Sequence, residues 1–515
     1  MSTGDKHDMQ IPGHAGHGHV THGDRPANVF LRRQIKLPRR LHRVLGVSGL
    51  FGAAYGDVGS SVYYALGVVS MSALGLTPPV LMISGIIFLF TALTYAEGAT
   101  ALPEAGGSGA FAKRAFNDWV SFIASWVLMM DYLVTMSISA FSAANYLGFF
   151  IPLLKTWPSN SIVGMVIVGC LALINTMGLK ESSRLNVILV VIDLGTQICV
   201  AILGAILIIN IPVLIQNVHW GVAPTMDQVL FGISISMVAY TGIETVANLG
   251  SETKNPGKSI PRAVMLVFAA VIMMYAFLSM TALSAYPVYQ APDGKWVTDL
   301  TQKFLEDPVM GIAYAMPGII PFFLGFWVAL LAATILIIAT NAGMLGASRL
   351  AYFMGQRQQL PSFFGGISKK SRVPQNAILI FSAIAAALIS TGRVELLADL
   401  YAFGAVLAYT SAHASIIALR IKEPNLPRPF KIPLNIRIKG REIPVTAILG
   451  GLATAVTWLI VVYTHHLGRI VGFSWVAIGL LAYFLYRVYK RKHPPGSEMG
   501  QSSSAGACFL LFVLL

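Results

Sequence analysis

Apolar segments of about twenty residues recur along the whole chain, and this repetition restricts the fold more than any other feature. A helix of that length crosses the hydrocarbon core of a bilayer. Of the 515 residues, 55% are hydrophobic and only 11% are charged, whereas a soluble domain carries about 25% charged residues. The sequence therefore predicts an all-α polytopic membrane protein.

Twelve transmembrane helices are predicted from these segments. Their approximate ranges are 45–73, 79–100, 118–148, 160–178, 185–210, 228–250, 263–286, 315–342, 375–391, 396–419, 444–464 and 471–488. If the N-terminus lies inside, the outer connections carry only Lys155, Lys295, Lys303, Arg393 and Arg469 of the 36 basic residues. Because basic connections stay in the cytoplasm, we expect a multi-pass plasma membrane protein with both termini cytoplasmic.

Three regions follow from this assignment. Residues 1–43 form a cytoplasmic tail, rich first in His and Gly and then in basic residues; 44–490 form the membrane domain; and 491–515 form a second cytoplasmic tail, expected to be disordered. The cysteines Cys170, Cys199 and Cys508 show no CxxC spacing. Neither a disulfide framework nor a metal or cofactor site is predicted.

The first predicted helix contains the segment from Gly52 to Tyr64, which combines three glycines with Ser60, Ser61 and Asp57. Tight packing at small residues is one explanation for the glycines. A carboxylate within the membrane is costly and usually faces a solute or ion path. Asp57 therefore favours an unwound stretch at Gly59–Ser61 whose free backbone groups coordinate a solute.

The sixth predicted helix carries a matching pattern, with Gly242 in mid-span and Glu244 close after it. Glycine-interrupted spans at corresponding positions of two halves indicate a transporter built from inverted repeats. We therefore expect a 5+5 inverted-repeat transporter fold, with helices 1 and 6 broken and helices 11 and 12 appended.

Further acidic residues lie in or near other spans. Asp131, Thr135 and Ser139 recur every four residues on the third helix and share one face, which predicts a cavity-lining stripe. Asp193, in the fifth span, either carries a coupling proton or forms an interhelical hydrogen bond. Glu97 and Glu104, near the inner end of the second helix, are expected to pair with basic residues and latch a cytoplasmic gate.

At these residues the chain resembles the amino acid-polyamine-organocation (APC) superfamily of secondary transporters. The resemblance covers residues 45–490 and rests on the glycine-broken first helix and on three further segments. These are Tyr95–Gly98 with Leu102–Phe111, the sixth helix with the connection Ser251–Arg262, and Glu423–Phe430. It implies an inverted-repeat fold with a central site between helices one, three, six and eight.

The chain departs from the usual pattern of amino acid permeases in that superfamily. Their first-helix break resembles Gly-Ser-Gly, whose amides receive a substrate carboxylate, whereas this chain has Gly59-Ser60-Ser61 with Asp57 nearby. A carboxylate repels that substrate group, so the departure favours a cation or an amine. The polar set Asp57, Tyr64, Asp131, Thr135, Ser139, Thr241 and Glu244 also resembles that of the potassium-uptake permeases, and hard cations prefer oxygen ligands.

The sequence thus predicts a cation-coupled importer of an amino acid or related amine, driven by protons or sodium, with potassium uptake as the alternative. An enzyme or a non-transporting sensor is disfavoured because no HExxH, GxSxG or Walker-type motif occurs. No nucleic acid partner is expected, and the oligomeric state is left open. The predicted substrate-binding residues are Asp57, Gly59, Ser60, Ser61, Tyr64, Asp131, Thr135, Ser139, Thr241 and Gly242, and the predicted ion-coupling residues are Glu244 and Asp193.

Overall fold

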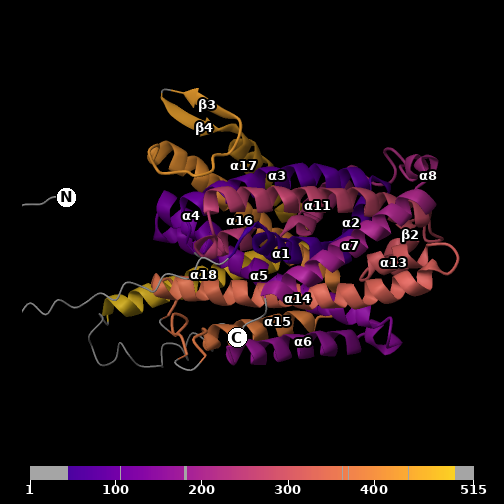
Figure 1. Cartoon of the computed structure of the whole chain (residues 1–515), viewed down its shortest axis with the longest axis horizontal. Helices are drawn as coiled ribbons and strands as arrows, with labels where there is room; N and C mark the ends of the chain where they lie inside the picture. The colour runs from indigo at the N-terminus through magenta and orange to yellow at the C-terminus, as the bar shows by residue number, and fades with distance from the viewer. Residues whose placement is uncertain are drawn as a thin grey trace, which may run out of the picture. The chain divides into compact units, whose positions relative to one another are not determined.

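The computed structural model describes residues 45–492, except 105, 179–182, 362, 369–370 and 439. The whole of the predicted tail 1–43 and all but the first two residues of the predicted tail 491–515 therefore lie outside the described residues. The described chain is mostly helical (Figure 1), as the composition predicts.

The α-helices follow one another with short connections. In the first half they are α1 (Val47–Val58), α2 (Val62–Ala73), α3 (Thr77–Ala101), α4 (Gly107–Ala115), α5 (Asp118–Leu147), α6 (Ser159–Thr176), α7 (Ser183–Leu207), α8 (Ile211–Gln216) and α9 (Met226–Ser236). In the second half they are α10 (Glu244–Asn248), α11 (Pro256–Ala285), α12 (Asp299–Lys303), α13 (Pro308–Tyr314), α14 (Ile320–Gln356), α15 (Gln375–Ile389), α16 (Val394–Lys422), α17 (Val445–Thr464) and α18 (His466–Lys492).

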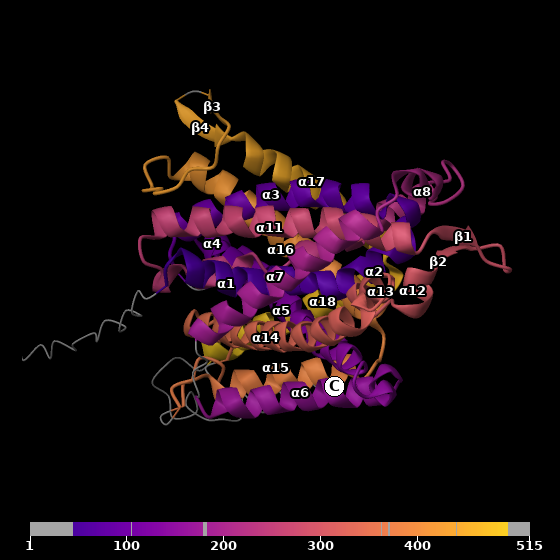
Figure 2. The same ribbon diagram turned by 45° about the vertical axis from the view of Figure 1, so that its right-hand side comes forward.

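Short elements join these helices. The 3-10 turns are η1 (Gly59–Ser61), η2 (Leu74–Leu76), η3 (Pro152–Lys155), η4 (Met237–Tyr240) and η5 (Gly250–Glu252). Two antiparallel hairpins pair β1 (Val288–Gln290) with β2 (Trp296–Thr298) and β3 (Asn435–Ile438) with β4 (Arg441–Pro444). In both views, α4, β3 and β4 lie at one end of the bundle, and β2 and α8 lie at the other (Figure 1, Figure 2), where Figure 2 also shows β1 and α12.

Ten helical segments of the described chain are long and apolar enough to cross a membrane. One of them, Val47–Ala101, contains both of the first two predicted spans, because α1 to α3 follow one another without a non-helical gap. The ninth predicted span corresponds to α15, which has 15 residues and is roughly 22 Å long, shorter than a typical hydrocarbon core. Each predicted span thus contains helix, and the total of twelve crossings remains a prediction.

The long helix α5 forms the centre of the core. It packs against α14 and α16, and its side chains are buried almost continuously from Ser121 to Tyr146. By contrast, peripheral helices expose apolar side chains such as Val166 on α6 and Ile206 on α7. In a helical membrane protein such surfaces face lipid, so the burial pattern agrees with a multi-pass membrane protein. Neighbouring pairs include α3 with α11 and α6 with α15 (Figure 1, Figure 2).

Candidate functional site

The first predicted helix is divided by the 3-10 turn η1. Gly59 has φ −70° and ψ −27°, and Val62 is also in the right-handed helical region, so the chain stays helical through the turn. This corrects the expectation of an unwound stretch at Gly59–Ser61. The physical reason is packing, because a Cβ on Gly59 would lie 2.6 Å from the ring of Tyr55. The glycine therefore permits a close contact rather than freeing backbone groups.

The sixth predicted helix is fully interrupted. After η4 the chain leaves helical geometry at Thr241 and Gly242, and α10 then begins at Glu244. Gly242 has φ +111°, a conformation that side chains other than glycine rarely adopt. A Cβ on Gly242 would lie 2.8 Å from Cγ of Asp57 and 2.9 Å from the backbone nitrogen of Val58. The break in the sixth helix therefore lies directly against the end of α1.

Three carboxyl side chains meet near this contact. Asp57, Asp131 and Glu244 come from α1, α5 and α10, and each is at most 3% exposed. The Thr245 hydroxyl donates to Oδ2 of Asp57 at 2.7 Å, and the Tyr409 hydroxyl donates to Oε2 of Glu244 at 3.2 Å. Asp131 lies close enough to Glu244 for a proton to bridge the two carboxyls. The fold thus brings together three acidic residues that the sequence places on separate helices.

This carboxyl cluster has more acceptors than donors. Among the described residues, no donor reaches Oδ1 of Asp57, Oε1 of Glu244 or either oxygen of Asp131. None of the ion pairs in the described chain involves these three groups. Buried carboxylates that repel each other are strongly unfavourable. The site therefore requires protons, a bound cation, or both.

Hydroxyl groups surround the cluster. Thr135 shares a hydrogen bond of 2.6 Å with Tyr401, and Tyr64 shares one of 2.9 Å with Ser61. Tyr401 and Tyr409 both belong to α16, where a spacing of eight residues places them on one helix face. These tyrosines are absent from the predicted site residues, because that prediction rests on acidic residues and glycine breaks. Their spacing within a predicted span is the signal that would have indicated them.

The other predicted substrate-binding residues have local partners or lie farther away. The Ser60 hydroxyl donates to the carbonyl oxygen of Asp57 at 2.7 Å, and the Thr241 hydroxyl donates to the preceding turn at 2.9 Å. Ser139 is buried eight residues beyond Asp131, which is roughly 12 Å along the helix axis. Of the predicted stripe on the third helix, Asp131 and Thr135 therefore lie at the cluster, and Ser139 lies outside it.

Asp193 belongs to a separate network behind α1. Its Oδ1 accepts a hydrogen bond of 2.6 Å from Tyr63, and its Oδ2 accepts one of 2.8 Å from Gln197. Gln197 in turn accepts a hydrogen bond of 3.0 Å from Tyr55. Both carboxyl oxygens of Asp193 thus have donors from α2 and α7. Of the two roles considered from sequence, this geometry favours the interhelical hydrogen bond over proton coupling.

An ion cluster lies at the end of α3. Glu97 accepts hydrogen bonds of 2.7 and 2.6 Å from the guanidinium of Arg420, and Arg428 approaches it at 3.3 Å. Nearer the surface, Glu104 forms an ion pair of 2.8 Å with Arg357. The predicted pairing of both glutamates with basic residues is therefore present. A gating role for these pairs remains a prediction.

The bundle and its central carboxyl cluster define a polytopic helical membrane protein of the transporter class. The model of the amino acid permease family matches residues 45–513, and the chain belongs to this family. The assignment places it in the APC superfamily, as its sequence motifs indicate, and among transporters rather than enzymes.

Several relatives have known names. The branched-chain amino acid permease BcaP of Bacillus subtilis is 25% identical over 88% of this chain and 94% of its own length. The methylthioribose transporter of the same species is 26% identical, with 85% of this chain and 90% of its own length covered. The low-affinity putrescine importer PlaP of Escherichia coli is 25% identical, with 82% and 88% covered.

Proposed function

We propose that this protein imports an amino acid or a related amine across the plasma membrane, coupled to an inward gradient of protons or sodium. The observation that carries the proposal is the cluster of Asp57, Asp131 and Glu244, which is buried where the end of α1 meets the break in the sixth helix and has no cationic partner among the described residues. An ammonium group would supply the missing positive charge. The relative named as a putrescine importer supports an amine as the solute.

The charge of the cluster suggests how solute and coupling ion are combined. Three buried carboxylates are neutralised by one ammonium group and two protons, or by a diamine and one proton. Asp57 is proposed to bind the ammonium group because it lies at the contact with the Gly242 break. Glu244 is proposed to carry the coupling proton because Asp131 lies beside it and can share that proton.

The remaining proposed roles follow from position. Backbone and hydroxyl groups around the cluster would orient the solute, and helix η1 retains helical hydrogen bonding, so it offers few free amides to a substrate carboxylate. This favours recognition through the amine end. The proposed solute-binding set is Asp57, Gly59, Ser60, Ser61, Tyr64, Asp131, Thr135, Thr241 and Gly242, with Ser139 as a more distant member and with Tyr401 and Tyr409 added from the structure.

Potassium uptake is the second candidate. The cluster and its surroundings offer only oxygen ligands, which a hard cation prefers. The relatives named above are instead an amino acid permease, a methylthioribose transporter and a putrescine importer. The amine therefore remains the first proposal.

The membrane topology is part of the proposal. We infer twelve crossings, two inverted five-helix repeats, and a transporter domain over residues 44–490 with both termini cytoplasmic. The basic residues of the inner connections support this orientation. Single cysteines introduced at Lys295 and at Lys258 test it in intact cells, because an impermeant thiol reagent should label only the first. Labelling of the cysteine at position 258 alone would indicate the opposite orientation.

Transport itself is tested with purified protein in proteoliposomes. Under an imposed inward proton or sodium gradient, we expect accumulation of a labelled diamine or cationic amino acid above that of a neutral amino acid. Rubidium uptake in the same vesicles, and growth of a potassium-uptake-deficient strain at low potassium, test the second candidate. Rubidium uptake without any amine uptake would replace the first proposal with the second.

A further inference from the structure

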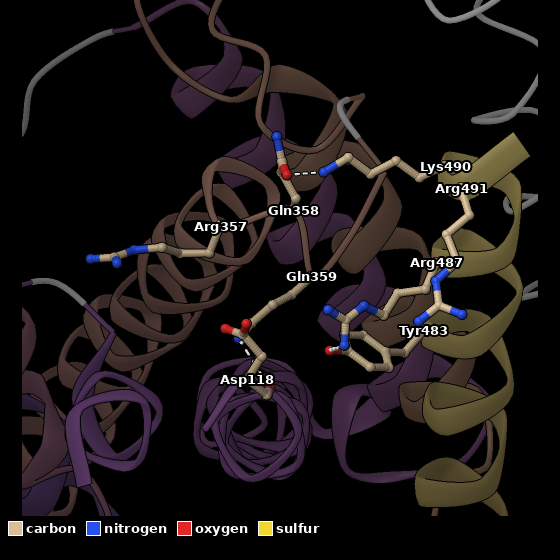
Figure 3. A pocket seen from close by; sticks show the side chains of 8 residues that line it. All are labelled: Asp118, Arg357, Gln358, Gln359, Tyr483, Arg487, Lys490 and Arg491. Carbon is tan, nitrogen blue, oxygen red and sulfur yellow. Dashed lines mark hydrogen bonds between the residues drawn. The ribbon is translucent and has the colours of Figure 1, made fainter. Parts of the chain in front are cut away.

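A cavity of about 270 Å³ lies where the last turns of α18 approach the end of α14 and the start of α5 (Figure 3). Tyr483, Arg487, Lys490 and Arg491 line it from α18, and Gln358 and Gln359 line it from the segment after α14. It is separate from the carboxyl cluster, and none of the predicted site residues contributes to it.

The cavity is strongly cationic. The guanidinium of Arg487 lies over the ring of Tyr483 at 5.4 Å and donates to its hydroxyl at 3.0 Å. Lys490 is hydrogen-bonded to the side-chain oxygen of Gln358 (Figure 3). None of the ion pairs of the described residues involves Arg487, Lys490 or Arg491.

The other charges at the rim are already paired. Asp118, the one carboxylate lining the cavity, is bonded to Lys113. Arg357 lines the opposite side but forms its ion pair with Glu104 at 2.8 Å. Three cations on α18 are thus left without a described carboxylate, and the cavity fits a ligand with negative charge.

The surface beside the cavity indicates which anion fits. Along α18, Phe484, Arg487 and Arg491 are spaced by three and four residues, so they lie on one face. Phe484 is 56% exposed, and the neighbouring Leu481 is 45% exposed. An apolar surface that ends in a cluster of basic side chains matches the boundary between acyl chains and headgroups.

Two general effects explain in part why basic residues lie at the end of α18. Cations are favourable at a helix C-terminus, and basic residues gather on the cytoplasmic side of membrane proteins. Neither effect requires the side chains to converge with Tyr483 and Gln358 around one cavity. The convergence is what points to a ligand.

We propose that this cavity binds the phosphate headgroup of an anionic phospholipid, whose acyl chains lie along Leu481 and Phe484. Arg487 and Arg491 bind the phosphate oxygens, since guanidinium groups match the geometry of phosphate. Lys490 adds a third positive charge. This site is independent of the solute that the protein carries.

The test uses the purified full-length protein after removal of lipid in neutral detergent. Binding of fluorescent phosphatidylglycerol is compared for the wild type, Arg487→Gln/Arg491→Gln, and the control Lys258→Gln/Arg441→Gln. The control removes two exposed charges that lie outside the cavity. We expect saturable binding to the wild type and about twenty-five-fold weaker binding to the cavity variant, from roughly fivefold for each of the two basic residues. The control should change binding at most about twofold.

Further binding measurements distinguish the possible ligands and test whether the variants are misfolded. Phosphatidylcholine should bind far more weakly than phosphatidylglycerol to the wild type. Binding to Arg487→Lys/Arg491→Lys should be tighter than to the glutamine variant but weaker than to the wild type, because lysine keeps the charge and loses the guanidinium geometry. Inorganic phosphate and glycerol 3-phosphate should fail to compete at lipid-equivalent concentrations. Equal weakening in the cavity and control variants would indicate diffuse electrostatics and overturn the proposal. Full competition by either soluble phosphate would identify a soluble ligand and overturn the lipid assignment.

Discussion

Replacing Glu97 by glutamine should destabilise the protein far more than the same change at Glu104. The Glu97 carboxylate is 1% exposed and receives both hydrogen bonds of the Arg420 guanidinium, whose side chain is 2% exposed. It also accepts the backbone N–H of Ile432 at 2.9 Å. Glutamine would remove the negative charge that pairs with both Arg420 and Arg428, and it would place an amide donor against other donors.

The magnitude follows from burial. Removing one partner of a buried ion pair costs about 3–5 kcal/mol, and Glu442 at 3.2 Å from Arg420 offsets part of this, so we expect about 3 kcal/mol for Glu97→Gln. Glu104 and its partner Arg357 are 56% and 39% exposed, and such surface pairs contribute less than about 1 kcal/mol. Equilibrium unfolding of both variants in the same detergent measures the difference.

A third variant identifies the cause of the loss. If an unpaired charge is responsible, Glu97→Gln/Arg420→Gln should be more stable than Glu97→Gln alone. A double variant that loses the full sum of the two single effects would refute the charge argument. So would a Glu97→Gln variant that unfolds within about 1 kcal/mol of Glu104→Gln.

Four further predictions concern other sites. Gly242→Ala should lose about 2–4 kcal/mol of stability because it combines a positive φ with a Cβ 2.8 Å from Asp57, whereas Gly169→Ala on α6, where nothing lies within 4 Å, should change the unfolding free energy by at most about 1 kcal/mol. Asp57→Asn should lower kcat/KM for uptake about a hundredfold with little loss of folded protein, and unchanged kinetics would remove it from the mechanism. Glu244→Gln should abolish gradient-driven accumulation but preserve solute exchange in proteoliposomes, and normal accumulation would contradict its coupling role. Burial raises the pKa of Glu306, in the connection between α12 and α13, from 4.5 to about 7. The stabilisation that is present below pH 4.5 is therefore lost as the pH rises to about 7, and in Glu306→Gln this part of the decline in unfolding free energy should be missing.

Part of the site was predictable because its signals are local. A carboxylate within an apolar segment is costly wherever that segment packs, so the positions of Asp57, Asp131 and Glu244 within apolar segments indicate them as candidates. Gly242 is indicated as a helix interruption because it lies in the middle of a predicted span. The partners of these residues were not predictable in this way, because Thr245 and Tyr409 reach Asp57 and Glu244 only across the folded bundle.

The sequence by itself determined that this chain is a multi-pass helical membrane protein, because the transfer of each apolar segment into lipid depends on its own composition and length. Tertiary structure decided which glycine interrupts a helix. Gly59 remains helical beneath the ring of Tyr55, while Gly242 adopts a positive φ where the backbone meets α1. It also decided that Asp193 is fully hydrogen-bonded and that the other three carboxyls share one unpaired cluster. Such outcomes depend on contacts between residues distant in sequence, and those contacts are set only when the helices pack.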